Sequence, residues 1–245
     1  MPTRLVHLVV DATDPPRLAR FWADALEWDI VLEEPDEVAV QPPGFSYPGT
    51  AALPLVFVPV PEPKTVPSRV HLDLASTSAE HQAAVARRLQ DLGARPADIG
   101  QGDVPWVVLA DPEGNEFCVL EPRPVYAGTG PVAAIVIACA DPEALARFWA
   151  GAAGWSRHSS DADRFALRSP SGLGPYLELL RADGAKTVKN RIHPDVAPYP
   201  GDDYRAEVAG LRQSGATPSD VGQGEVPWTV LADPEGNEFC VLSRR

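Results

Sequence analysis

Two kinds of hydrophobic pattern alternate along the chain. Short runs rich in β-branched and apolar residues, such as residues 5–10 and 69–77, are typical of strands. The strand at 5–10 is followed by Asp14 and Pro15, a favourable cap and first position for a helix. Apolar residues from Leu18 to Leu26 then recur at helical spacing. The pattern therefore predicts a strand followed directly by an amphipathic helix.

The strand-then-helix unit occurs four times. The tripeptide Val-His-Leu at residues 6–8 returns at residues 70–72, and the corresponding positions in the second half are 133–135 and 192–194. Further short strands are expected after each helix. They lie near residues 29–32, 37–41, 53–59, 106–110 and 116–120. The order strand, helix, strand, strand, strand predicts four modules.

A long internal repeat groups these modules in pairs. The sequence WVVLADPEGNEFCVL at residues 106–120 recurs at residues 228–242 with one change. Repeats of this kind define the structural unit, so residues 1–123 and 130–245 are predicted to be two homologous domains. The polar segment 121–130 is the expected linker. Within the repeat, Pro112 and Gly114 favour a tight turn that joins two strands as a hairpin.

Composition and charge narrow the function classes. The chain of 245 residues is 44% hydrophobic and 22% charged, with a net charge of −13 and a pI near 4.7. Such a charge repels nucleic acid and anionic lipid, so neither is expected as a partner. No apolar run has membrane-spanning length and no leader is recognisable, so a cytoplasmic location is predicted. Three cysteines without close spacing are interpreted as small buried hydrophobic residues.

Three features together resemble a known family. They are the strand bearing a histidine at the start of a module, the helix sequence ARFWADALEW, and the closing DPEGNEFCVL hairpin. The chain resembles the glyoxalase/bleomycin resistance/extradiol dioxygenase superfamily, also called the vicinal oxygen chelate superfamily, over essentially its whole length. The resemblance implies an α+β fold with four βαβββ modules paired into two glyoxalase-like domains. Each domain would be a cupped mixed sheet with helices outside.

The resemblance also points to site residues in the first half. Metal-binding members of the family take ligands from the first and last strands of each module, which places His7 and His71 at first-strand positions. Cys118 stands where such members usually have a glutamate. Because side chains alternate along a strand, Asp73 shares the face of His71, and Glu116 shares the face of Cys118. If a divalent metal is bound at all, His7 and His71 are its expected ligands.

The second half offers a weaker set of metal ligands. Its first-strand positions are Ala134 and His193, and Cys240 stands on its closing strand. Glu178 is the carboxylate of module three, and the sequence leaves its direction open. Trp106 is expected to pack on the sheet or to line the cup. Because a cysteine stands at the closing-strand position of both halves, no metal or other cofactor is expected. A bound divalent metal is the alternative.

Three functions remain open. The first is a binder of a small organic molecule in an apolar cup with polar anchors, like the drug-resistance branch of the family. The second is a metal-dependent lyase or isomerase of the glyoxalase type. The third is a metal-free enzyme in which His7 or His71 is a general base. The first is preferred, the enzyme status stays open, and a homodimer is compatible with the sequence.

Overall fold

The computed structural model describes residues 3–243 and contains the four predicted modules. Each module has one strand, one helix and further strands in that order. Module one contains β1 (Arg4–Ala12), α1 (Pro15–Leu26), β2 (Asp29–Glu33), β3 (Val38–Gln41) and β4 (Leu55–Pro59). Module two contains β5 (Val70–Leu74), α2 (Ala79–Asp91), β6 (Arg95–Pro96), β7 (Val107–Ala110) and β8 (Glu116–Val119).

The second half repeats this order after a short 3-10 helix, η1 (Pro124–Tyr126), in the predicted linker. Module three contains β9 (Val132–Cys139), α3 (Pro142–Ala153), β10 (Ser156–Ser160), β11 (Arg164–Arg168) and β12 (Tyr176–Arg181). Module four contains β13 (Ile192–Ala197), α4 (Tyr204–Gln213), β14 (Thr217–Pro218), β15 (Thr229–Ala232) and β16 (Glu238–Val241). The prediction of four βαβββ modules is confirmed.

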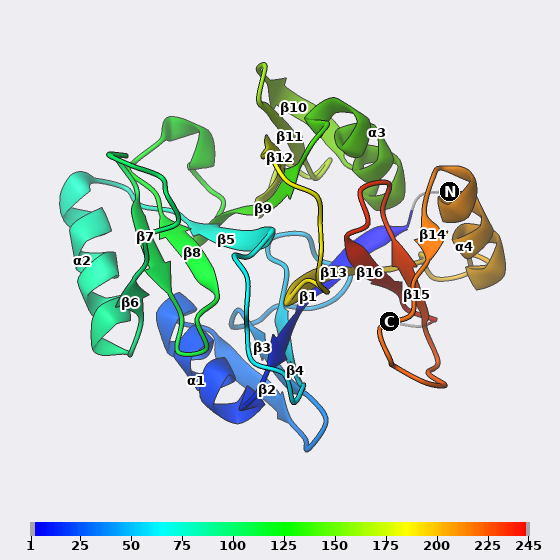
Figure 1. Ribbon diagram of the computed structural model, residues 1–245, viewed down its shortest axis with the longest axis horizontal. Coiled ribbons are helices and arrows are strands. Elements are labelled where there is room, and N and C mark those ends of the chain that lie inside the picture. Colours follow the sequence, from blue (N-terminus) through cyan, green and yellow to red (C-terminus); the bar gives the residue numbers. More distant parts are fainter. Residues whose placement is uncertain (1–2, 244–245) are drawn as a thin grey trace.

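The modules form two mixed sheets of eight strands each. Sheet one has the order β14-β15-β16-β13-β1-β4-β3-β2, and sheet two has the order β10-β11-β12-β9-β5-β8-β7-β6. Each sheet joins one module from each half: module one with module four, and module two with module three. In Figure 1, sheet one runs from β2 at the bottom to β14 on the right, and sheet two runs from β6 on the left to β10 at the top. That residues 1–123 and 130–245 are separate domains stays a prediction.

Helix α1 begins and ends where the sequence indicates, and α3 begins with the same kind of cap. The side chain of Asp14 accepts a hydrogen bond from the backbone N–H of Arg17, and Asp141 accepts one from Ala144 in the second half. These bonds satisfy amide groups that the first helical turn leaves without a partner.

None of the helices in the described part of the chain has the length and the apolar run that a membrane crossing requires.

The repeated DPEGN turn connects the two modules of each half. Asp111 accepts hydrogen bonds from the indole Nε1 of Trp22 on α1 and from the side chain of Asn115. Both carboxylate oxygens of Glu113 accept bonds from the backbone N–H groups of the two residues before α1. The turn therefore fastens the closing hairpin of module two to the helix of module one.

The same contacts recur in the second half. Asp233 accepts from Trp149 Nε1 and from Asn237, and Glu235 accepts from the two residues before α3. Each half is thus held together by its helix and hairpin, whereas each sheet is assembled across the halves. The DPEGN turn therefore has the same structural role in both halves.

The buried apolar side chains form two clusters. The larger one fills the space around the helices and includes Leu72 on β5 and Ile135 on β9. The smaller one lies on the opposite face of sheet two, because alternate residues of a strand point to opposite faces. Its members are Val108, Cys118, Leu120, Tyr126, Ala133, Ala134, Val136, Ala166 and Tyr176. We call this inner face of sheet two cup two, and the inner face of sheet one cup one.

Candidate functional site

Cup two brings His71, Asp73 and Cys118 together. His71 and Asp73 are two residues apart on β5, so their side chains share one face. Cys118 on β8 lies directly across from Asp73 in the parallel pairing of the two strands. The apolar neighbours on β5 point to the helices and hold the strand in place, which leaves the polar residues facing the cup.

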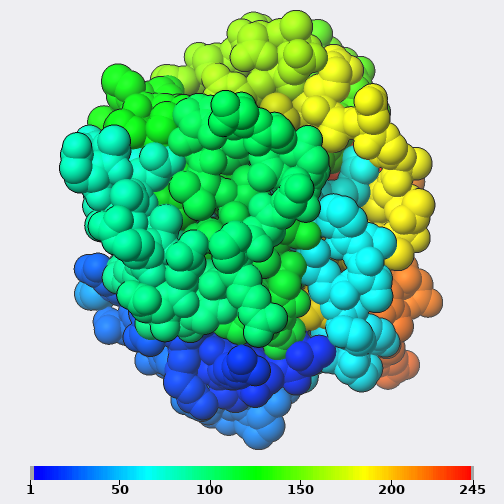
Figure 2. Space-filling model, turned by 60° about the vertical axis from the view of Figure 1, so that its left-hand side comes forward, coloured from blue at the N-terminus to red at the C-terminus, as the bar shows by residue number. Residues whose placement is uncertain are grey.

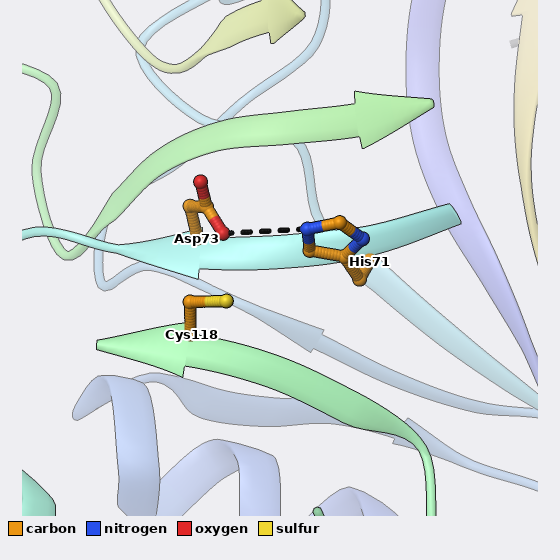
Figure 3. Close-up of side chains that lie close together, drawn as sticks. All are labelled: His71, Asp73 and Cys118. Atoms are coloured by element: carbon orange, nitrogen blue, oxygen red, sulfur yellow. Dashed lines mark ion pairs between the residues drawn. The ribbon is translucent and has the colours of Figure 1, made fainter. Parts of the chain in front are cut away.

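The three side chains present one donor atom each to a common space. A nitrogen of His71, an oxygen of Asp73 and the sulfur of Cys118 all lie within 4.8 Å of one another. His71 Nε2 is 3.5 Å from Asp73 Oδ1, and this oxygen has no hydrogen-bond partner among the described residues. Figure 3 shows Cys118 on the neighbouring strand, with its sulfur directed toward the space below His71 and Asp73.

Burial changes the acid–base behaviour of this group. It lowers the pKa of His71 to about 4, so the imidazole is neutral at neutral pH. It raises the pKa of Asp73 to about 7, and the negative charge of Glu178 adds to the effect. Burial and the adjacent Asp73 also raise the pKa of Cys118, which keeps the thiol protonated.

The facing wall of cup two carries a second polar group. Glu178 Oε1 on β12 accepts hydrogen bonds from the hydroxyl of Tyr126 at 2.9 Å and from Arg164 Nη1 at 2.9 Å. Glu178 lies opposite Val136 of β9 in the strand pairing, and Val136 lies opposite His71. The side chain of Glu178, whose direction the sequence left open, therefore faces the cup.

Cup one contains an equivalent group. A nitrogen of His193, an oxygen of Asp195 and the sulfur of Cys240 lie within 4.8 Å of one another. Cys240 Sγ is 3.6 Å from His193 Nε2. His7 on β1 adds a contact that cup two lacks, because its Nε2 is 3.0 Å from Asp195 Oδ2. At the position of His7, module three has Ala134.

The expectation that His7 and His71 share one site is wrong. His7 lies in sheet one beside β13, and His71 lies in sheet two beside β9. The reason is that the modules pair across the halves, so the two first strands of one half never meet in one sheet. A metal held by His7 and His71 together is excluded by this arrangement.

Two further predicted site residues, Trp106 and Glu116, have different surroundings. Trp106 is half-buried, packs against the apolar cluster of cup two and lies beneath the guanidinium of Arg123 at 5.7 Å. Glu116 is instead used structurally, since its carboxylate binds Lys64 Nζ at 2.6 Å and the backbone N–H of Ser68 at 3.0 Å. These bonds fasten the segment before β5 to the closing strand.

The sequence reasoning missed Asp195 and Tyr126. Asp195 has the same spacing from His193 as Asp73 has from His71, so a comparison of the two segments would have found it. Tyr126 lies in the linker, where no hydrophobic period marks it, and only the folded chain brings it into the cup.

Comparison with known proteins assigns the family. The family model described as Glyoxalase-like domain matches residues 7–120 and again residues 134–242. The chain belongs to the glyoxalase-like domain family. The two matches coincide with the two halves of the internal repeat. No curated protein matches the sequence of this chain.

Solved structures show the same fold at low sequence identity. Glyoxalase I from Zea mays is 12% identical, with a TM-score of 0.65 and coverage of 98% of this chain and 92% of that one. A putative dioxygenase from Bacillus subtilis is 13% identical, with a TM-score of 0.62 and coverage of 99% and 86%. At such identities the likeness concerns the fold, and function has to be argued from the site.

The glyoxalase-like fold is often associated with a divalent metal, and the donors present fit one. One imidazole nitrogen, one carboxylate oxygen and one sulfur are a set that zinc accepts. Asp73 Oδ1 and Asp195 Oδ1 are buried and have no hydrogen-bond partner among the described residues, as expected of an atom available to an ion. Each thiol would have to lose its proton on metal binding. The ligands in cup two would be His71, Asp73 and Cys118.

Proposed function

We propose that the protein binds a small organic molecule in cup two. The observation that carries the proposal is the composition of this inner face. Seven further members of the apolar cluster surround two polar groups, His71, Asp73 and Cys118 on β5 and β8 and the Glu178 group on β12, and β9 with Ala134 and Val136 lies between these groups. Ligand sites in proteins commonly combine an apolar lining with a few convergent polar groups.

A comparison of the two cups favours cup two. Tyr176, Ala134 and Asp73 are neighbours across three adjacent strands of sheet two. Alanine is smaller than His7, which at the equivalent position of cup one extends to Asp195. A ligand above Ala134 would reach polar groups on both sides.

The polar groups suit a ligand that carries a carbonyl or hydroxyl group. Neutral His71 can accept a hydrogen bond or a proton, and Asp73 with a pKa near 7 can donate or accept. Arg164 is held by Glu178 at the other wall. The arrangement supports recognition of oxygen atoms at both ends of a compact molecule.

Blocking one cup at a time tests the proposal. Val136 and Val9 occupy equivalent positions in cups two and one, so Val136→Phe and Val9→Phe are matched variants. A set of small aromatic and carbonyl compounds is screened by thermal shift and by equilibrium dialysis. We expect Val136→Phe to abolish binding and Val9→Phe to retain it. Loss of binding in Val9→Phe alone would place the site in cup one and contradict the proposal.

A metal-dependent activity of the glyoxalase type is the second candidate, favoured by the donors in both cups. When bound, a divalent ion polarises adjacent oxygen atoms of a substrate. Zinc titration of metal-free parent, Cys118→Ser and Cys240→Ser proteins tests it. Zinc bound at micromolar or tighter affinity and weakened by Cys118→Ser supports a metal in cup two, and unchanged weak binding in all three proteins rejects it.

A cytoplasmic location and the lack of nucleic-acid and membrane partners are part of the proposal. They are supported by the net charge of −13 and by the three cysteines, which are buried and form no disulfide. Homodimer formation is likewise a prediction, which sedimentation of the purified protein would test.

A further inference from the structure

The linker between the halves covers cup two. Residues 121–130 are exposed or half-buried except for Tyr126 and Thr129. In Figures 1 and 2 this green segment lies between module two and module three. Gly128 and Gly130 have φ values of +81° and +80°, conformations that suit glycine. The segment lies at the surface and is attached by the buried Tyr126 and Thr129, by a hydrogen bond from the Tyr176 hydroxyl to the carbonyl of Val125, and by Arg123 over the ring of Trp106.

The side chain of Tyr126 attaches the linker inside the cup. It is 5% exposed and belongs to the same apolar cluster as Cys118, Ala134 and Val136. Its ring packs edge-on against the ring of Tyr176, with a centroid distance of 5.7 Å. The phenol thus occupies space within the inner face of the sheet.

The hydroxyl of Tyr126 uses the polar anchor of the cup. It donates to Glu178 Oε1, the same oxygen that accepts from Arg164 Nη1. Glu178 stands on β12, next to the central strand β9 and opposite the wall that carries His71. The side chain of Tyr126 therefore makes the contacts that a ligand with an aromatic ring and a hydroxyl group would make there.

We propose that Tyr126 is an internal occupant of cup two and that a small phenol displaces it, moving the linker away from the cup. The inference rests on the proposed function, since it needs cup two to be the ligand site. It adds the ligand class, a phenol or similar hydroxylated aromatic compound. It also requires that the linker, residues 121–130, moves away from cup two before a ligand can bind.

The electrostatics of the site agree with a neutral hydroxyl group. Burial and the negative charge of Glu178 raise the pKa of Tyr126, so the phenol keeps its proton and donates to the carboxylate. A phenolate in the same place would be repelled by Glu178. A displacing ligand is therefore recognised as a hydrogen-bond donor.

The first experiment measures binding of 4-methylphenol, which has the structure of the tyrosine side chain, and of toluene, which lacks the hydroxyl. The proteins are the parent, Tyr126→Phe and Tyr126→Gly. Because the parent must first release its own phenol, we expect Tyr126→Gly to bind 4-methylphenol about tenfold or more tightly than the parent does. Tyr126→Phe should lie between them, because it keeps the ring and loses the bond to Glu178. Equal affinity in the parent and both variants would overturn the inference.

Hydrogen exchange separates displacement from simple filling of a cavity. The amides of Tyr126, Ala127 and Thr129 donate to carbonyls within the linker. Saturating 4-methylphenol should speed their exchange in the parent, because the linker leaves the cup. Binding to cup two in the parent with unchanged or slower exchange would reject the internal occupant and leave the proposed function intact. Absence of any binding to cup two, in Tyr126→Gly as in the parent, would reject both.

Discussion

The indole Nε1 of Trp22 donates a hydrogen bond of 3.2 Å to Asp111 Oδ2, and Trp149 makes the same 3.2 Å bond to Asp233. In each case a helix of one module is tied to the closing turn of the next. Because the sheets are assembled across the halves, these bonds, together with those of Glu113 and Glu235, are among the polar links that hold the two modules of one half together. The repeated sequence DPEGN therefore serves the packing of modules, and the ligand sites are built elsewhere.

Replacing Asp111 by alanine should destabilise the protein strongly. The buried carboxylate accepts bonds from Trp22, from Asn115 and from backbone amides of the turn, and these donors would lose their partner. We expect a loss of about 3 kcal/mol or more in the free energy of unfolding, measured by urea denaturation. Trp22→Phe removes one of these bonds and should cost less. A loss below about 1 kcal/mol for Asp111→Ala would contradict the importance of the link.

The hairpin turn itself depends on glycine. Gly114 and Gly236 have φ values of +87° and +83°, and a Cβ atom at either position would meet no atom within 4 Å. The cost of Gly114→Val should therefore come from the backbone alone, at about 1 kcal/mol or more. Thermal melting of Gly114→Val and Gly236→Val checks this. Gly151→Val is not a suitable control, because Gly151 lies in helix α3. The matched control is Gly114→Asn. Asparagine tolerates positive φ better than valine does, so this variant should melt closer to the parent.

The sequence predicted the modules well because two signals agree. The Val-His-Leu tripeptides marked the first strands, and the apolar face of α1 marked the helix that follows. These signals could not predict which modules pair to form a sheet. Hydrophobic alternation tells which face of a strand is buried, but all four first strands are similarly apolar and nothing local selects the neighbour. For this reason His7 was placed with His71, although it lies beside Asp195.

Within cup two the sequence indicated which side chains lie together where they share a strand or stand on adjacent strands, and their role as a site stays a prediction. His71 and Asp73 follow from period two, and Cys118 from its place on the closing strand. Tyr126 could not be found in this way, because its position depends on how the linker crosses the sheet.

Asp73 should give the protein a measurable pH response. Its folded pKa of about 7 is above the ordinary 3.8, so its contribution to stability is present below pH 4 and is lost as the pH rises to 7. His71 acts in the opposite direction: with a folded pKa near 4, its contribution is present above pH 6.5 and is lost as the pH falls to 4. The two effects largely cancel in the parent between pH 4 and 6.5.

Asp73→Asn removes only the first effect. Relative to the parent, this variant should gain up to about 1.4 kcal/mol of stability per pH unit between pH 4 and 6.5. Urea denaturation in the presence of a chelator measures the difference. A difference between parent and variant that does not change with pH would contradict the elevated pKa of Asp73.

The three cysteines should react slowly in the native protein. All are buried, and burial raises their pKa, that of Cys139 to about 12. Since the thiolate is the reactive form, labelling by a disulfide reagent at pH 8 should be about a hundredfold slower than for an exposed thiol. Denatured protein is the control, and all three of its thiols should react at once. Rapid labelling of Cys118 in the folded protein would show that cup two is open and the thiol ionised.

The most direct test of the account is a methyl NMR titration with 4-methylphenol. Val108, Leu120, Ala134, Val136 and Ala166 report on cup two, and Val9 and Val56 are paired neighbours on the strands of sheet one. The account predicts saturable shifts at the methyl groups of cup two, with one ligand per chain and no comparable shifts in sheet one. It also predicts that these shifts saturate at lower ligand concentration in Tyr126→Gly. Shifts confined to Val9 and Val56, or no saturable shifts in either protein, would contradict the assignment of cup two as the ligand site.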